Sequence, residues 1–173
     1  MGTMKRISSP IMKALKSIVA DQGMVAKIGY FPSAVYPDGK PIAGIAMVQE
    51  FGVPEKNIPA RPFFRPTIDE QRPAWRQIVS DGMSLAAQGK MTTRGVLTAL
   101  GGVASEDVKA KISSIFEPPL SQGTLRGRAR RAGVTLKKQA AKAGVSVVSI
   151  VSTKPLVDTG AMLAHLTFEV GKE

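Results

Sequence analysis

Two adjoining stretches with apolar residues at helical spacing constrain the fold more than any other feature of the chain. Residues 67–88 and residues 92–116 repeat apolar side chains at steps of three and four, which predicts two long amphipathic helices. The first carries Ile68, Trp75, Ile78, Val79 and Met83, and the second carries Val96, Leu100, Val103, Val108, Ile112 and Ile115. Thr92 is the predicted N-cap of the second helix. Each glycine of its Gly101-Gly102 pair destabilises a regular helix by about 1 kcal/mol relative to alanine, so we expect a kink or a close helix contact there.

Shorter elements precede this pair. Ile7, Ile11, Leu15 and Ile18 line one face of a predicted N-terminal helix, which exposes Lys13 and Lys16 to water and ends at Gly23. Residues 24–31 predict a short strand, residues 36–41 a turn, and residues 42–51 a second short helix with Gly52 as its C-cap.

A proline-rich loop follows this second helix. Pro54, Pro59, Pro62 and Pro66 fall within residues 53–66. Proline is excluded from helix interiors and central strands, so we expect an ordered loop that presents Phe63 and Phe64.

The C-terminal third predicts an arm and then a return to the sheet. Pro118-Pro119 ends the second long helix, and residues 145–151 are dense in β-branched residues, which favours a strand. Further on, Asp158 or Thr159 caps a short helix, and residues 166–170 alternate as a closing strand that can pair with residues 24–31. The sequence therefore predicts one α+β domain over residues 1–173. A small antiparallel sheet of the N-terminal and C-terminal strands packs against two long helices, and residues 118–155 form an inserted basic arm.

The charge of the chain is concentrated in this arm. The formal net charge is +11 over 173 residues, and residues 118–157 contribute +8 because they contain no acid. Seven cations fall within seventeen residues: Arg126, Arg128, Arg130, Arg131, Lys137, Lys138 and Lys142. Such a run can neutralise phosphates regardless of base sequence, and no aromatic residue interleaves it for base stacking. If the arm touches nucleic acid, we expect contact with its backbone regardless of sequence, with a solvated arm as the alternative.

Composition removes several classes of protein. The chain has no cysteine, so a disulfide scaffold, a thiolate zinc site and a cysteine nucleophile are excluded. Charged residues and Pro10 interrupt the apolar runs near the N-terminus, so we expect no signal peptide and synthesis in the cytoplasm. No apolar run is long enough to predict a membrane span.

Candidate catalytic groups are sparse. Residues 158–161 read Asp-Thr-Gly-Ala, which is similar to the active-site loop of retroviral-type aspartic proteases, but the thirteen residues after Gly160 are too few to build a substrate cleft. His165 is the only histidine, so one chain cannot form a histidine cluster. The adjacent acids at 69–70 and 106–107 point in different directions on a helix. We predict no enzyme activity, no cofactor and no metal site, and we expect Asp158, Thr159 and Gly160 to form a structural turn or cap.

Three blocks in order carry a resemblance to a known family. Residues 46–52 read A-M-V-Q-E-F-G, residues 58–66 read I-P-A-R-P-F-F-R-P, and the third block joins P-L-S at 119–121 and T-L at 124–125 with K-P-L-V-D-T-G-A-M-L at 154–163. Together they resemble the tail-completion or neck proteins of long-tailed double-stranded-DNA phages, the minor tail protein Z-like and virion-morphogenesis group. The stretch from about 126 to 153 departs from the family pattern.

The resemblance implies an α+β virion structural protein at the head-tail junction and names no catalytic residues. Such a subunit completes the tail and joins it to the head connector as a ring around the DNA channel, with sixfold symmetry expected. Its partners would be further copies of itself, the connector or stopper, the tail terminator or tube proteins, and double-stranded DNA. We expect a subunit interface made by Glu50, Phe51, Arg61, Phe63, Phe64 and Arg65. Anchoring of both phenylalanines to their own core is the alternative for the loop, and a sequence-nonspecific DNA-binding protein is the alternative for the whole chain.

Overall fold

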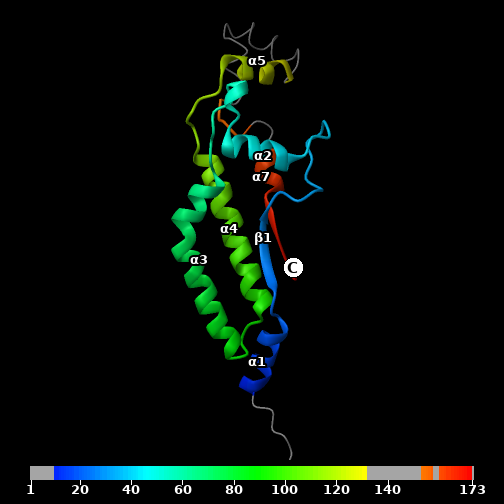
Figure 1. The fold of residues 1–173 in the computed structure, drawn as a ribbon, viewed down its shortest axis with the longest axis vertical. Coiled ribbons are helices and arrows are strands. Elements are labelled where there is room, and N and C mark those ends of the chain that lie inside the picture. Colours follow the sequence, from blue (N-terminus) through cyan, green and yellow to red (C-terminus); the bar gives the residue numbers. More distant parts are fainter. Residues whose placement is uncertain (1–9, 132–152, 158–159, 173) are drawn as a thin grey trace, which may run out of the picture. The chain divides into compact units, whose positions relative to one another are not determined.

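The computed structural model describes residues 10–131, 153–157 and 160–172, and these residues fall into two compact units (Figure 1). Unit 1 comprises Met1–Gly29, Pro66–Val108 and Leu166–Glu173, and unit 2 comprises Tyr30–Arg65 and Lys109–His165. Both long helices cross a boundary between the units.

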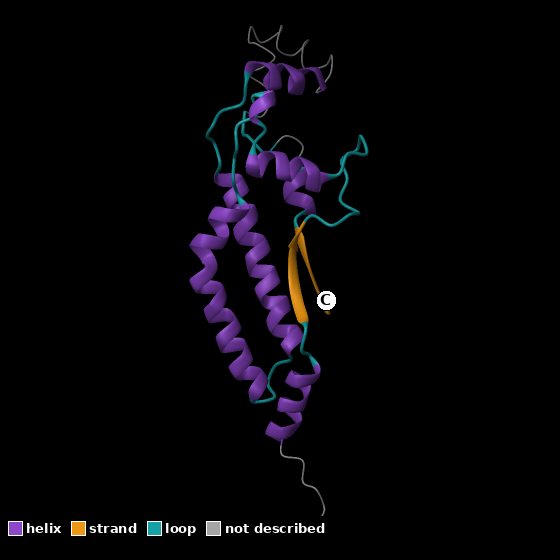
Figure 2. Cartoon of the chain, in the orientation of Figure 1, coloured by secondary structure: helices purple, strands orange, loops and turns teal. Residues whose placement is uncertain are grey.

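Helices dominate the described residues, with one small sheet (Figure 2). The helices are α1 (Pro10–Ala20), α2 (Ile42–Phe51), α3 (Phe64–Ala87), α4 (Thr93–Ser114), α5 (Gln122–Arg131) and α7 (Ala161–His165), with a short 3-10 helix η1 (Pro54–Lys56). The strands are β1 (Met24–Gly29) and β2 (Thr167–Lys172). The predicted α+β class, with helices and a small sheet of N-terminal and C-terminal strands, is confirmed.

In unit 1 the two strands pair antiparallel, as predicted. Met24 lies opposite Lys172 and Gly29 opposite Thr167. Figure 1 shows α3 and α4 side by side, with β1 beside α4. A backbone carbonyl of β2 is also held from α4, since the Arg94 guanidinium donates to the Val170 oxygen at 2.9 Å.

The glycine pair of α4 serves strand packing. A Cβ added at Gly101 would lie 2.4 Å from the Phe168 ring of β2, closer than any real contact. The predicted close approach therefore exists, but its partner is a strand residue. The two long helices contact each other at a different position, where Val96 of α4 packs against the backbone of Gly82 in α3. The predicted N-cap is confirmed, because the Thr92 hydroxyl accepts the Gly95 N–H at 3.0 Å.

The predicted inner face of α1 is confirmed only in part: Ile18 is half-buried, whereas Ile7 lies outside the described residues. Ala14 is buried, whereas Leu15 is exposed together with Met12 and Val19. Lys13 and Lys16 are exposed, as predicted. Small residues allow close packing of the helix, which explains why Ala14 takes the inner position although its side chain is less apolar than that of Leu15.

Unit 2 is built around α2. Its predicted bounds are confirmed, and Gly52 is its C-cap with φ 73° and its N–H bonded to the Val48 oxygen at 2.8 Å. Helix α7 contacts α2. The buried apolar side chains of unit 2 come from distant parts of the chain: Ala34, Ile42, Ala46, Phe63, Ile112, Leu125, Ala129, Leu156 and Met162.

Helix α3 begins three residues earlier than predicted. It starts at Phe64 and includes Pro66, which the sequence places in a loop. Proline is tolerated in the first turn because the N–H it lacks has no partner within the helix there. The helix also continues through Pro73, and the loop before it contains η1 and an isolated bridge between Val53 and Ile58.

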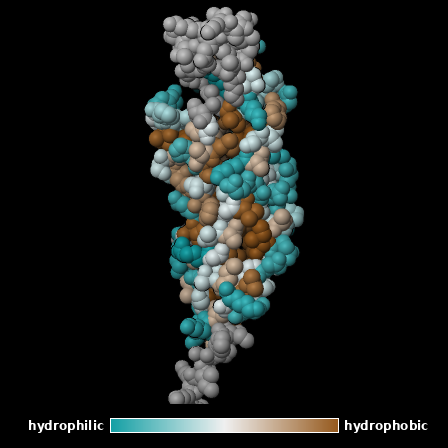
Figure 3. Space-filling view, turned by 180° about the vertical axis from the view of Figure 1, so that it is seen from behind, coloured by the Kyte–Doolittle hydropathy of each residue, from teal (hydrophilic) through white to brown (hydrophobic). Residues whose placement is uncertain are grey.

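Large apolar side chains reach the surface in separate patches among hydrophilic ones, as one face shows in Figure 3. Across residues 10–131, 153–157 and 160–172, no helix is both long and apolar enough to cross a bilayer.

Candidate functional site

The carboxylate of Glu50 organises the first two blocks of the resemblance. It lies buried at the end of α2 and accepts the backbone N–H groups of Phe63 at 2.7 Å, Phe64 at 2.9 Å and Arg65 at 3.2 Å. These N–H groups lie at the start of α3, where a helix has donors without internal partners. A negative charge at this end also interacts favourably with the helix dipole. Glu50 thus caps α3 from a distance of thirteen residues along the chain.

Two opposing effects set the ionisation of Glu50. Burial alone would raise the pKa of its carboxyl. The hydrogen bonds from the Phe63 and Phe64 N–H groups and from Arg65 outweigh burial, so the pKa of Glu50 is lowered. The carboxylate is therefore ionised wherever the fold is intact near neutral pH.

Gly52 lets the chain turn back toward Glu50. Its φ of 73° lies in the left-handed region, and a Cβ there would lie 2.7 Å from the Ala60 nitrogen. This explains in physical terms the E-F-G ending of the first block: the glutamate caps the next helix and the glycine admits the returning loop.

Arg61 makes a second set of contacts, which joins the proline-rich loop to residues 118–119 and to α2. Its buried guanidinium donates from Nε to the Pro118 oxygen at 2.8 Å, from Nη2 to the Pro119 oxygen at 3.0 Å, and from Nη1 to the Gln49 side chain at 3.3 Å. Burial lowers the pKa of Arg61, and the positive charge of Arg128 lowers it further. The planar fork of arginine suits the two adjacent carbonyls. The second block is thereby joined to the start of the third.

Arg128 fastens the two parts of the third block together. It lies buried on α5 and donates from Nη1 to the Lys154 oxygen at 2.9 Å and to the Val157 oxygen at 3.3 Å. Ser121 caps the same helix, since its hydroxyl accepts the Thr124 N–H at 3.2 Å. We call the three fastenings, centred on Glu50, Arg61 and Arg128, the clamp.

The residues predicted for a subunit interface separate into two groups. Glu50, Arg61 and Phe63 are buried within the chain, so the alternative of an anchor in its own core holds for Phe63. Phe64 is half-buried, with its ring edge-on to Tyr30 at 6.4 Å between centroids. Phe51 and Arg65 are exposed, and they are the part of the predicted set that reaches the surface.

The seven predicted arm cations are also placed differently from one another. Arg126 and Arg130 are exposed on α5, one helical turn apart. Arg128 is buried and bonded to backbone, which corrects its predicted phosphate-facing role, because carbonyl oxygens engage its guanidinium. Arg131 ends α5, and Lys137, Lys138 and Lys142 lie outside the described residues, as does the predicted strand at 145–151.

The Asp-Thr-Gly-Ala stretch precedes α7. Asp158 and Thr159 lie outside the described residues, and Gly160 has φ 76° directly before the helix, with its oxygen accepting the Ala164 N–H at 2.9 Å. His165 ends α7 and its Nδ1 lies 2.9 Å from the Ala161 oxygen. Among the described residues, no three histidine or carboxylate side chains gather as metal ligands would.

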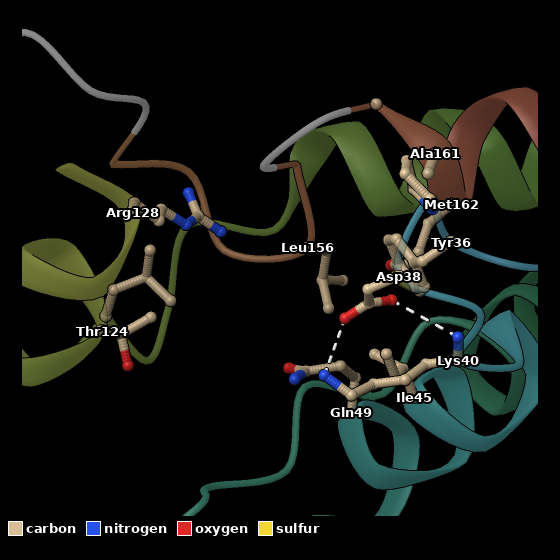
Figure 4. A pocket seen from close by; sticks show the side chains of 13 residues that line it. Tyr36, Asp38, Lys40, Ile45, Gln49, Thr124, Arg128, Leu156, Ala161 and Met162 are labelled. Atoms are coloured by element: carbon tan, nitrogen blue, oxygen red, sulfur yellow. Dashed lines mark hydrogen bonds and ion pairs between the residues drawn. The ribbon is translucent and has the colours of Figure 1, made fainter. Parts of the chain in front are cut away.

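A pocket of about 410 Å³ opens in unit 2 (Figure 4). Its apolar lining includes Ile45, Leu120, Leu156 and Met162, and polar groups of Tyr36, Asp38, Lys40, Gln49, Thr124 and Arg128 complete it. Asp38 pairs with Lys40 at 2.7 Å. Sequence reasoning missed this pocket because its lining residues come from four separate segments.

Comparison of the chain with protein-family models, curated proteins and solved structures finds no match.

Proposed function

We propose that the chain is a virion structural protein at the head-tail junction of a long-tailed double-stranded-DNA phage. In this function it completes the tail and joins it to the head connector as a ring around the DNA channel, with six copies expected. The ring would contact the connector or stopper on one side and the tail terminator or tube on the other.

The clamp is the observation that carries the proposal. Glu50 and Arg61, from the first two blocks, and Arg128, which lies between the two parts of the third block, each bond to backbone groups of the same chain. Side chains used in this way hold loops in one conformation, and a preformed surface loses little entropy when it docks. The blocks that resemble neck proteins therefore have a structural role: they hold the loops of a preformed docking surface.

A test removes the reading frame from the phage that encodes it and supplies it again in trans. We expect lysates without the chain to contain DNA-filled heads and separate tails, and complementation to restore joined, infectious particles. Complementation by an Asp158→Asn variant separates this function from the aspartic protease alternative. Infectious particles in the complete absence of the chain would overturn the proposal.

Nonspecific DNA binding is a second candidate, favoured by the exposed pair Arg126 and Arg130 on α5. Arginines one turn apart can meet successive phosphates of one strand. This candidate expects tight duplex binding by the isolated monomer with a steep salt dependence, whereas a neck subunit needs only weak contact because DNA must pass through the ring.

A further inference from the structure

An exposed apolar ridge lies on one side of α2. Met47 and Phe51 are one helical turn apart and are 63% and 58% exposed. The guanidinium of Arg65 stacks 4.5 Å above the Phe51 ring, and Glu50 holds that guanidinium through Nε at 2.9 Å and Nη2 at 3.0 Å. The ridge is therefore positioned in advance, and aromatic and arginine side chains are the residues that most often dominate protein contacts.

The pocket lies on the opposite side of the same helix. Ile45 and Gln49 line it, and each stands two residues before a ridge residue. Two residues along an α-helix correspond to a rotation of about 200°, so the ridge and the pocket point in nearly opposite directions. A chain cannot fill its own pocket with its own ridge.

A second copy of the chain can supply what the pocket lacks. The pocket has apolar lining residues and the volume for a phenylalanine and a methionine side chain, and Figure 4 shows the Asp38 carboxylate among them, bonded to Lys40. Asp38 is the one acid among the described lining residues. Arg65 travels with Phe51, so docking brings its guanidinium toward the Asp38 carboxylate, which also pairs with Lys40 at 2.7 Å.

We propose that the Met47–Phe51 ridge of one copy inserts into the pocket of the next copy. This contact joins two different surfaces, and contacts of that kind repeat head to tail and close into a ring when the rotation allows. The inference rests on the proposed function and deepens it, because it names the contact between neighbouring neck subunits.

Three variants of the full chain test the contact. Phe51→Ala removes the ridge, and Thr124→Trp obstructs the pocket from an exposed position in its lining. Phe116→Ala is the matched control, because Phe116 is 57% exposed and also carries a cation, the Lys154 ammonium, 5.0 Å from its ring centroid. Circular dichroism melts establish that each variant folds.

Sedimentation measures self-association at about 0.1 mM, where specific contacts of modest affinity are populated. We expect the wild type and Phe116→Ala to associate equally, and Phe51→Ala and Thr124→Trp each to associate at least about thirtyfold more weakly. Mixing the last two should restore one contact only, giving a one-to-one dimer that grows no further. A monomeric wild type, equal association of all four proteins, or a mixture that stays monomeric would overturn the proposal.

Cross-linking identifies the occupant directly. A photoreactive benzoylphenylalanine at position 51, in an equal mixture of light and nitrogen-15 chains, should link to the pocket residues of a differently labelled copy. Links within one chain, for example to residues 132–152, or links between two ridges would also overturn it. The neck function is tested separately on particles, so its failure and the failure of this contact are distinguishable.

Discussion

The Glu50 carboxylate lies 2.7 Å from the backbone nitrogen of Phe63, and this contact ties the end of α2 to the residues that begin α3. The same carboxylate accepts from the next two backbone nitrogens. One side chain thus holds the first two blocks of the resemblance together.

Replacing Glu50 by glutamine should destabilise the protein by about 1.5–3 kcal/mol, the range for hydrogen bonds to a charged group. The amide keeps the shape of the side chain but points a donor at backbone donors. Urea unfolding measures the loss. Glu55→Gln, at an exposed glutamate of η1, is the control and should change stability by less than about 0.5 kcal/mol. Equal effects of the two substitutions would refute the capping role.

The stabilisation by Glu50 should depend on pH. Its pKa is lowered in the fold below the ordinary 4.5, so the unfolded chain binds the proton more readily. The contribution is complete above the unfolded pKa and is lost as pH falls through the folded one. The difference in unfolding free energy between wild type and Glu50→Gln should therefore narrow below about pH 4.5. A difference that stays constant down to about pH 3 would contradict this linkage.

Arg61→Lys should destabilise unit 2 by about 1–3 kcal/mol, although it keeps the charge, because an ammonium cannot reproduce the fork that meets two adjacent carbonyls. Thermal melts of the full chain measure the change. Arg72→Lys, at an exposed arginine of α3, should leave the melting temperature unchanged within about 1 °C. A neutral Arg61→Lys would show that the fork geometry contributes nothing.

Alanine substitutions at two neighbouring glycines of α4 should change the stability of the protein in opposite directions. At Gly102 the nearest atom to a new Cβ is 4.0 Å away, so the helix should gain up to about 1 kcal/mol. At Gly101 the Phe168 ring is 2.4 Å away, and overpacking should cost about 1–3 kcal/mol despite the better helix propensity. Chemical denaturation of both variants tests this. Stabilisation by both would mean that Phe168 does not pack on Gly101.

Neutralising Arg126 and Arg130 together by glutamine should weaken duplex binding and reduce the salt slope by about two. The double variant of Arg72 and Arg76 removes the same charge from exposed positions at the same spacing on α3. Fluorescence anisotropy at several salt concentrations compares them. Equal losses of duplex affinity in the two double variants would mean that α5 contributes only its net charge.

Most of the helices and strands could be predicted from apolar periodicity and cap residues. The two strands, α2 with its glycine cap and the start of α4 at Thr92 follow from local patterns, because each depends on residues close in sequence. The inner position of Ala14 in place of Leu15 in α1 could not be predicted locally, because it depends on the elements that pack against the helix. The start of α3 was misplaced because its capping group, Glu50, lies outside the helix and its loop.

The candidate site was predictable only in part. The sequence singled out Glu50, Arg61 and Arg65 without distinguishing a clamp within the chain from contacts between chains, since both uses favour the same charged side chains. One signal for the clamp was available: an arginine between prolines, as at Arg61, has a restricted backbone and can be aimed at a fixed partner. The pocket left no such local signal, because Ile45, Leu120 and Leu156 meet only through the fold.

The most direct test of the central claim is the location of the chain in purified phage particles. Mass spectrometry should find it as a stoichiometric component, and antibody-gold labelling in electron micrographs should place it at the junction between head and tail. Particles that are complete, infectious and devoid of the chain, or labelling confined to the host cytoplasm, would contradict the account.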